Sequence, residues 1–130
     1  MKNIIIDCDP GLDDAVALLA AFGARDVRVL ALTTVAGNVK GPQTAYNARV
    51  IREVGHQNED VLVSEGAPRP ILREPVTAED FHGSTGLGGI DFPEPILPLS
   101  GEHAVNTIIQ LCRDAKSKPL TLIITGPMTN

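Results

Sequence analysis

The sequence has 130 residues, of which 43% are apolar and only 3% aromatic, and its formal net charge is −5. This length suits about one domain, whose core must be packed from Ile, Leu, Val and Ala, the usual residues of buried parallel strands. The negative charge argues against a nucleic acid or an anionic membrane as partner, and no apolar run reaches the roughly 18 residues of a membrane span.

The first residues lead straight into a short apolar segment without the hydrophobic region of a signal peptide, so we expect a cytoplasmic protein. Cys8 and Cys112 are too few and too distant in sequence for a disulfide framework, which makes reduced thiols the expectation. Because Cys8 lies between two aspartates, the pKa of its thiol should be raised. We therefore interpret Cys8 as a packing residue and a poor nucleophile.

A short apolar segment at residues 4–6 has strand character and ends abruptly in an acidic turn. Helix formers at residues 15–22 follow, so the pattern predicts a strand, a turn and a helix. The turn region carries four carboxylates within eight residues, Asp7, Asp9, Asp13 and Asp14. A single aspartate here is usually only a turn former or a helix cap, but four together indicate a site.

Four like charges this close repel one another, so a fold that gathers them should supply a cation or several hydrogen-bond donors. Asp13 and Asp14 lie where the helix presents unpaired N–H groups, which leaves Asp7 and Asp9 facing the mouth of the turn. Carboxylate oxygens without thiolates or a histidine cluster suit Mg²⁺ or Ca²⁺ better than zinc. The carboxyl end of a strand in an α/β sheet is also where ligands usually bind.

The helix at residues 15–22 is apolar nearly all round, which predicts that it is buried against the sheet. The β-branched segment at residues 27–35 predicts a second strand, with Asn38 shortly after its end. A Gly-Asn pair there is ordinarily only a turn. If the strands are parallel, however, Asn38 emerges at the same rim as Asp7 and Asp9 and becomes a ligand-facing amide.

The later elements continue the alternation of strands and helices. They are a helix at 42–54, a strand at 61–63, a helix at 102–115 with Ser100 as its N-cap, and a strand at 120–125. This rhythm is typical of right-handed βαβ units and predicts an open, mostly parallel α/β sheet with crossover helices. The sequence stops soon after the fourth strand, so we expect residues 1–130 to be the N-terminal part of a single domain.

Residues 67–101 lack helical or strand periodicity and contain six prolines and a glycine-rich run at 81–89. An irregular stretch of this length indicates either a wrong assignment of its elements or a functional loop such as a lid. The glycines lack the spacing of a phosphate-binding loop. His82, within this run, is as readily a capping or surface residue as a catalytic one, whereas His103 is expected to be structural or solvated.

Residues 7–15, with the sequence DCDPGLDDA, resemble the DxDPGxDD signature of the inosine-uridine preferring nucleoside hydrolase family. That family cleaves the N-glycosidic bond of ribonucleosides. The resemblance continues through residues 33–38, 81–83 and 124–130, so it covers nearly the whole chain in order. It implies an open α/β sheet with one Ca²⁺ at the strand ends.

Carried over position by position, the resemblance implies that Asp9 binds Ca²⁺ and acts as general base toward the attacking water. It implies that Asp14 binds the ion through both oxygens and that Thr125 contributes its main-chain carbonyl. Asp13 would hydrogen-bond a ribose hydroxyl, and Asn38 would lie beside the water and the sugar.

The resemblance further implies that Asp7 supports the turn and that His82 lies near the nucleobase. Family members are considerably longer, and their later half supplies another metal ligand, ribose-binding residues and, in many members, a histidine that protonates the leaving base. We therefore expect the isolated chain to bind Ca²⁺ weakly and to have little or no nucleosidase activity. Its expected partners are ribonucleosides and either further copies of itself or a complementing C-terminal portion.

Two other interpretations remain. The strand-end pair Asp7 and Asp9 also resembles the DxD of Mg²⁺-dependent phosphohydrolases of the haloacid dehalogenase type, although that family has no role for Asp13 and Asp14. A non-catalytic fragment that binds a metal ion or ribose is the alternative from another functional class.

Overall fold

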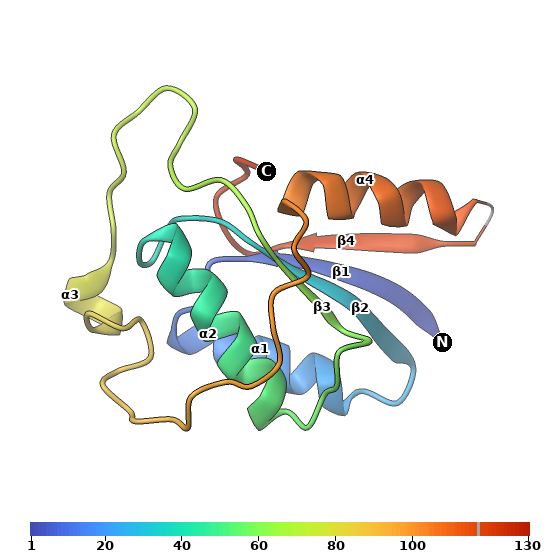
Figure 1. The fold of residues 1–130 in the computed structure, drawn as a ribbon, viewed down its shortest axis with the longest axis horizontal. Coiled ribbons are helices and arrows are strands. Elements are labelled where there is room, and N and C mark those ends of the chain that lie inside the picture. The colour runs from blue at the N-terminus through green and yellow to red at the C-terminus, as the bar shows by residue number, and fades with distance from the viewer. Residues whose placement is uncertain (117) are drawn as a thin grey trace.

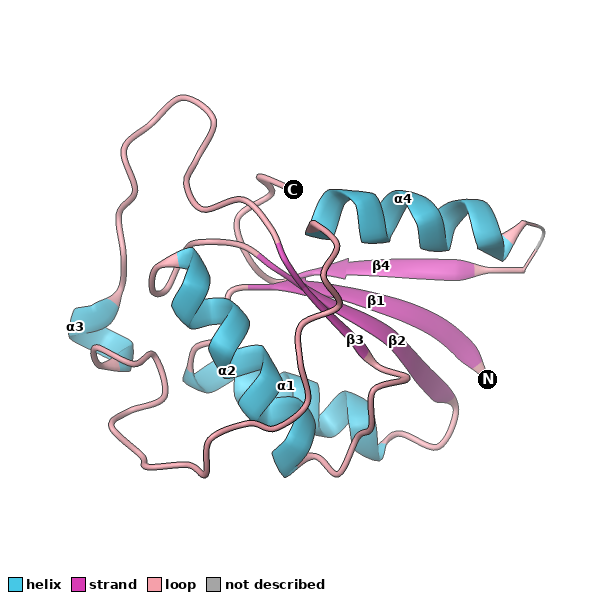
Figure 2. Ribbon diagram, in the orientation of Figure 1, coloured by secondary structure: helices cyan, strands magenta, loops and turns pink. Residues whose placement is uncertain are grey.

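Within residues 1–116 and 118–130, which the computed structural model describes, strands and helices largely alternate along the chain. The strands are β1 (Lys2–Cys8), β2 (Val27–Thr34), β3 (Leu62–Glu65) and β4 (Leu120–Ile124), and the helices are α1 (Leu12–Gly23), α2 (Gly41–Val54), α3 (Glu79–His82) and α4 (Ala104–Ala115). Irregular chain joins β3 to α4, interrupted by the single turn of α3 (Figure 2). No helix in this described part of the chain is long and apolar enough to cross a membrane.

The sheet is parallel throughout, with the spatial order β3-β2-β1-β4. Helices α1 and α2 lie on one side of it and α4 lies on the other (Figure 1). The chain moves outward from β1 to β3 and then crosses back to the far side of β1. The carboxyl ends of β1 and β4 therefore flank the switch point of a doubly wound sheet, where ligands of this architecture bind. The predicted open α/β sheet with crossover helices is confirmed.

The core lies between the sheet and the layer formed by α1 and α2. Because side chains alternate along a strand, Ile4, Ile6 and Cys8 share one face of β1, where they join Leu18 in the buried apolar cluster. Ile5 points to the other face and is fully buried as well. Burial on both faces is why β1 is a continuous apolar run rather than an alternating one.

Helix α1 begins at Leu12, three residues earlier than predicted, so that Asp13 and Asp14 lie in its first turn. The helix packs against the sheet with one face, as predicted, while its opposite face is open to solvent, since Val16 is 70% exposed. Its buried residues, Asp14 and Leu18, are four positions apart and share one face. The rest of the helix is rich in alanine, a strong helix former that favours this conformation without requiring burial.

Helix α4 begins at Ala104, and its N-cap is His103 rather than the predicted Ser100. The His103 ring accepts a hydrogen bond from Val105 N at 3.2 Å. Ser100 is drawn instead to the outer strand β3, where its main-chain N donates to Val63 O at 2.8 Å. The Ser100 hydroxyl accepts a hydrogen bond from Glu102 N at 3.2 Å, but the helix itself begins only after His103.

Part of the irregular segment at 67–101 is anchored to the body of the protein. Arg49 and Arg52 of α2 donate hydrogen bonds to the main-chain carbonyls of the proline-rich stretch that follows α3. The acceptors are Pro95, Leu97 and Pro98, at 2.8–3.0 Å. This half of the segment is therefore fastened across α2.

Candidate functional site

The polar residues that follow three neighbouring strands converge at one rim of the sheet. Asp9 follows β1, Asn38 follows β2, and Thr125 follows β4. Since the strands are parallel, their carboxyl ends meet at the same edge, as the sequence predicted for Asn38. Asp14 reaches this rim from the first turn of α1.

Asp9 is held by Asn38 and is only 6% exposed. Its Oδ2 accepts a hydrogen bond from the main-chain N of Asn38 at 2.8 Å, and its carbonyl oxygen accepts one from Asn38 Nδ2 at 2.9 Å. Burial raises the pKa of Asp9 to about 6, with a further rise from the charge of Asp14, while the N–H of Asn38 acts in the opposite direction. Asp9 is therefore a carboxylate that holds a proton more tightly than usual.

Two glycines allow the neighbouring strand ends to close on Asp9. A β-carbon at Gly37 would collide with Asp9 Oδ2. One at Gly126 would lie 3.1 Å from Asp9 Oδ1, tighter than an ordinary contact. The rims of β2 and β4 reach the carboxylate from two sides because neither position carries a side chain.

Asp14 receives hydrogen bonds from three parts of the rim. Its Oδ1 accepts from Thr125 Oγ1 at 2.7 Å, and its Oδ2 accepts from Gly11 N and from Asn38 Nδ2, both at 3.3 Å. Burial raises the pKa of Asp14, although the Thr125 hydroxyl and the Gly11 N–H partly offset that rise. The Asn38 carboxamide thus bridges the Asp9 main chain and the Asp14 carboxylate.

Asp7 does not face the mouth of the turn, which corrects the expectation drawn from the spacing of the aspartates. It is buried, and its Oδ1 accepts hydrogen bonds from Thr33 Oγ1 at 2.6 Å and from Asn130 Nδ2 at 2.8 Å. Side chains alternate along β1, so Asp7 lies on the opposite face from Ile6 and Cys8. These contacts fasten neighbouring strand ends to one another.

Asn130 is a further residue at this rim of the sheet. Besides Asp7, its Nδ2 donates to Thr34 O at 2.9 Å, and its Oδ1 accepts from Ala67 N at 2.8 Å. It therefore ties the ends of β1 and β2 to the chain that follows β3. No local pattern in the sequence marks this role, because all three partners are distant in sequence.

The remaining predicted residues differ in their placement. Asp13 is exposed at the start of α1. His82 is buried, and its Nδ1 accepts a hydrogen bond from the main-chain N of Leu12 at 3.1 Å, which brings the glycine-rich segment against the acidic turn. Asp9, Asp14, Asn38 and Thr125 form one connected cluster, with His82 beside it.

Cys8 lies beneath this cluster and has a packing role, as predicted. Its thiol is fully buried and donates to Thr33 O at 3.7 Å. Burial raises the pKa of the thiol well above its ordinary value, and the charges of Asp14, Asp7 and Asp9 add to the rise. The direction agrees with the sequence prediction, but the larger cause is burial rather than the flanking aspartates.

The donor set at the rim fits a hard cation. Asp9, Asp14 and Thr125 supply only oxygen atoms. Among the described residues, however, no group of three or more His, Cys, Asp or Glu side chains could hold a metal ion. Oxygen ligands without thiolates or a histidine cluster suit Ca²⁺ or Mg²⁺ better than zinc. Burial is the main cause of the raised pKa values of Asp9 and Asp14, and a bound cation would favour their charged forms.

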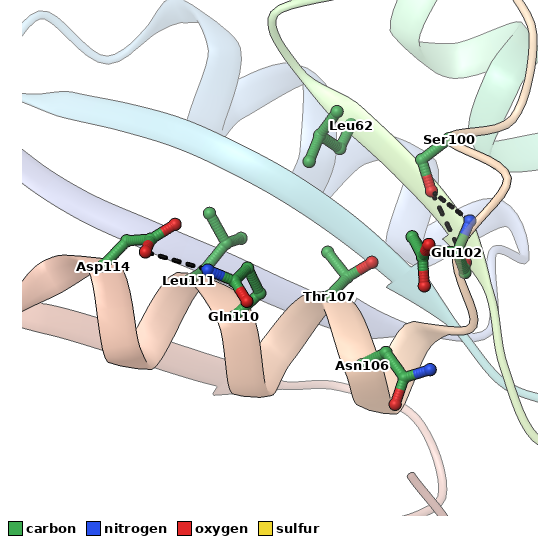
Figure 3. A pocket seen from close by; sticks show the side chains of 8 residues that line it. All are labelled: Leu62, Ser100, Glu102, Asn106, Thr107, Gln110, Leu111 and Asp114. Carbon is green, nitrogen blue, oxygen red and sulfur yellow. Dashed lines mark hydrogen bonds between the residues drawn. The ribbon is translucent and has the colours of Figure 1, made fainter.

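Two hollows flank the sheet. One of about 470 Å³ adjoins the site, since its lining includes Gly37, which contacts Asp9, and Pro127. Another of about 450 Å³ lies between α4 and β3 and shares none of the rim residues (Figure 3). Its lining consists of Leu62, Ser100, Glu102, Asn106, Thr107, Gln110, Leu111 and Asp114. Neither lining includes Asp9, Asp14, Asn38 or Thr125, and the first hollow is the nearer one only through Gly37.

The fold and the site define a doubly wound α/β protein with a carboxylate cluster at the switch point of its sheet. The chain belongs to the inosine-uridine preferring nucleoside hydrolase family, whose sequence profile matches residues 4–130. This membership agrees with the resemblance of the acidic turn and leaves the haloacid dehalogenase interpretation without support.

Individual relatives agree with this assignment. The chain is 40% identical to an inosine-uridine preferring nucleoside hydrolase of Leishmania major and 43% identical to a pyrimidine-specific ribonucleoside hydrolase of Photobacterium profundum, in each case over 99% of this chain and 41% of the relative. Among solved structures, a purine-preferring ribonucleoside hydrolase from Gardnerella vaginalis superposes with a TM-score of 0.90 at 29% identity, over 98% of this chain and 41% of that one. The chain thus spans about two fifths of the length of the relatives it matches.

Proposed function

We propose that this chain forms the carboxylate side of a site that hydrolyses the N-glycosidic bond of ribonucleosides to ribose and a free base. The observation that supports this most strongly is the convergence of Asp9, Asp14 and Thr125 at the switch point between β1 and β4. The names of the relatives, which include inosine-uridine preferring and pyrimidine-specific hydrolases, point to the same substrate class.

The proposed cofactor is Ca²⁺, held by Asp9, by both oxygens of Asp14 and by the main-chain carbonyl of Thr125. When bound, such an ion lowers the pKa of a coordinated water and orders vicinal hydroxyls of ribose. These ligands would leave room for substrate oxygens within the usual six to eight of Ca²⁺.

The chain's own groups have separate roles in this proposal. Asp9 takes a proton from the attacking water, a role that suits a carboxylate whose pKa lies near 6. Asn38 orients Asp9 through two hydrogen bonds and faces the water and the sugar. Asp13, exposed at the start of α1, accepts a hydrogen bond from a ribose hydroxyl.

His82 would lie near the nucleobase, and Asp7 supports the turn from beneath. The negative rim also suits the reaction, because N-glycosidic cleavage develops positive charge on the ribose, as in glycoside hydrolysis. We further propose that the protein acts in the cytoplasm and that its partner is a further copy or a complementing C-terminal portion.

Calorimetric titration with Ca²⁺ and ribose, beside an assay of inosine and uridine hydrolysis, tests this function. The unmodified chain should bind Ca²⁺ weakly and show little turnover. Asp14→Asn should abolish Ca²⁺ binding because it removes one charge and one oxygen ligand, whereas Asp26→Asn, at an exposed turn, should leave it unchanged. Absent Ca²⁺ binding by the unmodified chain, or turnover of p-nitrophenyl phosphate, would contradict the proposal.

A complementation assay separates an enzyme portion from a non-catalytic binder. The chain is co-expressed with the segment of a full-length relative that lies outside the matched part. Restored hydrolysis of inosine or uridine supports an enzyme portion, while metal or ribose binding without turnover in any combination supports the non-catalytic alternative. Turnover by the isolated chain at rates normal for a nucleoside hydrolase would overturn the expected weak activity.

A further inference from the structure

Asn47 of α2 is a buried carboxamide that has no role in the site described above. It is 1% exposed, and its carboxamide makes three hydrogen bonds to particular partners. Its Nδ2 donates to Pro10 O at 3.0 Å and to Thr85 O at 2.7 Å, while its Oδ1 accepts from Gln43 Nε2 at 2.9 Å. The bond from Gln43 fixes which way the amide faces, so both N–H groups point at main-chain carbonyls.

The hydrogen bond from Asn47 to Pro10 O is one of two side-chain bonds that hold the main chain of the acidic turn. The carbonyl of Asp9 accepts from the Asn38 carboxamide, and the next carbonyl, that of Pro10, accepts from Asn47. Two successive peptide groups are therefore held by amides from two different elements. Because Pro10 also has a restricted φ, the direction in which the chain leaves Asp9 and enters α1 is determined at this point.

The Thr85 contact attaches the glycine-rich segment to the same turn. Gly86 has a φ of +83°, and a β-carbon there would lie 2.9 Å from Asn47 Nδ2. Glycine therefore serves two purposes at this position, a left-handed backbone and a close approach to the amide. Thr85 can reach Asn47 only because its neighbour has no side chain.

A second bond closes the segment onto the turn from the other side. His82 Nδ1 accepts from Leu12 N at 3.1 Å, and a β-carbon at Gly11 would lie 2.8 Å from the His82 ring. The contacts at Pro10 and Leu12 thus flank Gly11, whose own N–H donates to Asp14 Oδ2. The turn that carries the carboxylates and the segment at 82–89 form a single hydrogen-bonded unit.

We propose that Asn47 is a positioning residue for the acidic site. Its carboxamide holds the Pro10 and Thr85 carbonyls together, and it thereby sets the orientation of the Asp9–Asp14 turn and keeps residues 82–89 against it. The contacts stand independently of the chemistry, but the expected effect on cation binding rests on the proposed function. Asn47 itself touches neither Asp9 nor Asp14 in the hydrogen-bond network.

Hydrogen exchange of single amides in the metal-free chain tests this inference. Asn47→Asp keeps the shape of the side chain but replaces both donors by an oxygen that repels the two carbonyls. Exchange at Asn38 N, which donates to Asp9, and at Leu12 N, which donates to His82, should accelerate by at least about tenfold, the effect of losing one ordinary hydrogen bond. Amides of β1 should be unchanged, and Gln43→Met, which keeps both donors of Asn47, should have a much smaller effect.

Ca²⁺ titration of the same variants provides the second readout, with an expected loss of about tenfold in affinity for Asn47→Asp. Unchanged exchange at Asn38 and Leu12, equal acceleration throughout β1, or faster local exchange with unchanged affinity would each overturn the positioning role. If Asn47→Asp does not fold, Gly86→Ala decides, since it breaks the Thr85 contact from the segment's side. Faster exchange at Leu12 in that variant supports the inference, and unchanged exchange refutes it.

Failure of the proposed function gives a different result. If the unmodified chain binds no Ca²⁺, the proposed cofactor is wrong, while the exchange rates at Asn38 and Leu12 still decide whether Asn47 positions the turn.

Discussion

Asp9 is the proposed general base, and its burial as a charged carboxylate also lowers the stability of the fold. It is almost fully buried beside a second carboxylate, and the ion pair found among the described residues, Arg69 with Glu74, is exposed and lies elsewhere. The charge is therefore offset by neutral donors such as Asn38 N rather than by a basic side chain. Neutral donors compensate only part of the desolvation, and the pKa of Asp9 remains raised to about 6.

This shift predicts the pH dependence of stability in the metal-free protein. The folded state holds the proton of Asp9 up to about pH 6, whereas an unfolded chain releases it near the ordinary value of 3.8. Between these values the folded state binds more protons, so the free energy of unfolding should fall as the pH rises. Asp9→Asn should flatten this fall and should be at least as stable as the unmodified chain at pH 7.5.

Urea unfolding in a chelator across pH 4–8 measures this effect. Asp26→Asn, which changes an exposed aspartate, serves as the matched control and should keep the unmodified profile. Parallel profiles for Asp9→Asn and the unmodified chain would contradict the assignment of the pH dependence to Asp9.

Helix α2 is the element that organises the irregular part of the chain. Asn47 holds the acidic turn, while Arg49 and Arg52 fasten the proline-rich stretch. Arg52 is 1% exposed, and it also donates to Val61 O at 3.0 Å at the entry to β3. Burial lowers the pKa of this guanidinium, because removing its charge from water is unfavourable. Its hydrogen bonds must offset this desolvation free energy.

Substitution of Arg52 decides which of these opposing effects is larger. Arg52→Met keeps a long apolar stem but leaves the carbonyls of Val61 and Pro98 without this donor. We expect the free energy of unfolding to fall by about 2 kcal/mol. Each buried acceptor left unpaired destabilises the fold by about 1–3 kcal/mol, and removal of the buried charge offsets part of this loss. Denaturant titration measures the change.

The exposed Arg28 on β2 supplies the control, for which Arg28→Met should lie within about 0.5 kcal/mol of the unmodified chain. An Arg52→Met variant as stable as this control would show that desolvation cancels the hydrogen bonds.

At the scale of the whole molecule, the most unusual feature is the strand β4 at one edge of the sheet. Its apolar side chains Leu122, Ile123 and Ile124 are each 39–40% exposed, on both faces of the strand. An apolar edge strand with unpaired main-chain groups is a template for association with another strand. The surface is consistent with the proposed partners, a further copy or a complementing portion.

We therefore expect the chain to self-associate as its concentration rises. Replacing Leu122 and Ile124 together by lysine should shift the population toward monomer, because charges on an edge strand oppose pairing. Sedimentation velocity over a range of concentrations measures the change. Ile71→Lys, at a loop position that is 80% exposed, should leave the distribution unchanged, and a monomer at every concentration would refute the expectation.

The sequence alone was enough to predict the order of the four strands and the three long helices, and the strand, acidic turn and helix around Asp9, but not the short helix α3. These features depend on short-range properties, namely the apolar run of β1, the helix formers of α1 and the density of carboxylates between them. The rule that parallel strands end at one edge was also enough to bring Asn38 to the same rim as Asp9. The roles assigned to the individual site residues stay predictions until binding and turnover are measured.

The tertiary structure decided which donor meets which acceptor. Asp7 turned inward to Thr33 and Asn130, Ser100 bonded to β3 while His103 became the N-cap of α4, and Asn47 reached two carbonyls nearly 40 residues away. Local propensities do not encode such pairings, because a side chain's partner depends on how distant elements cross and pack. Buried polar groups must nevertheless be paired, and that requirement selects the few long-range contacts that shape the site.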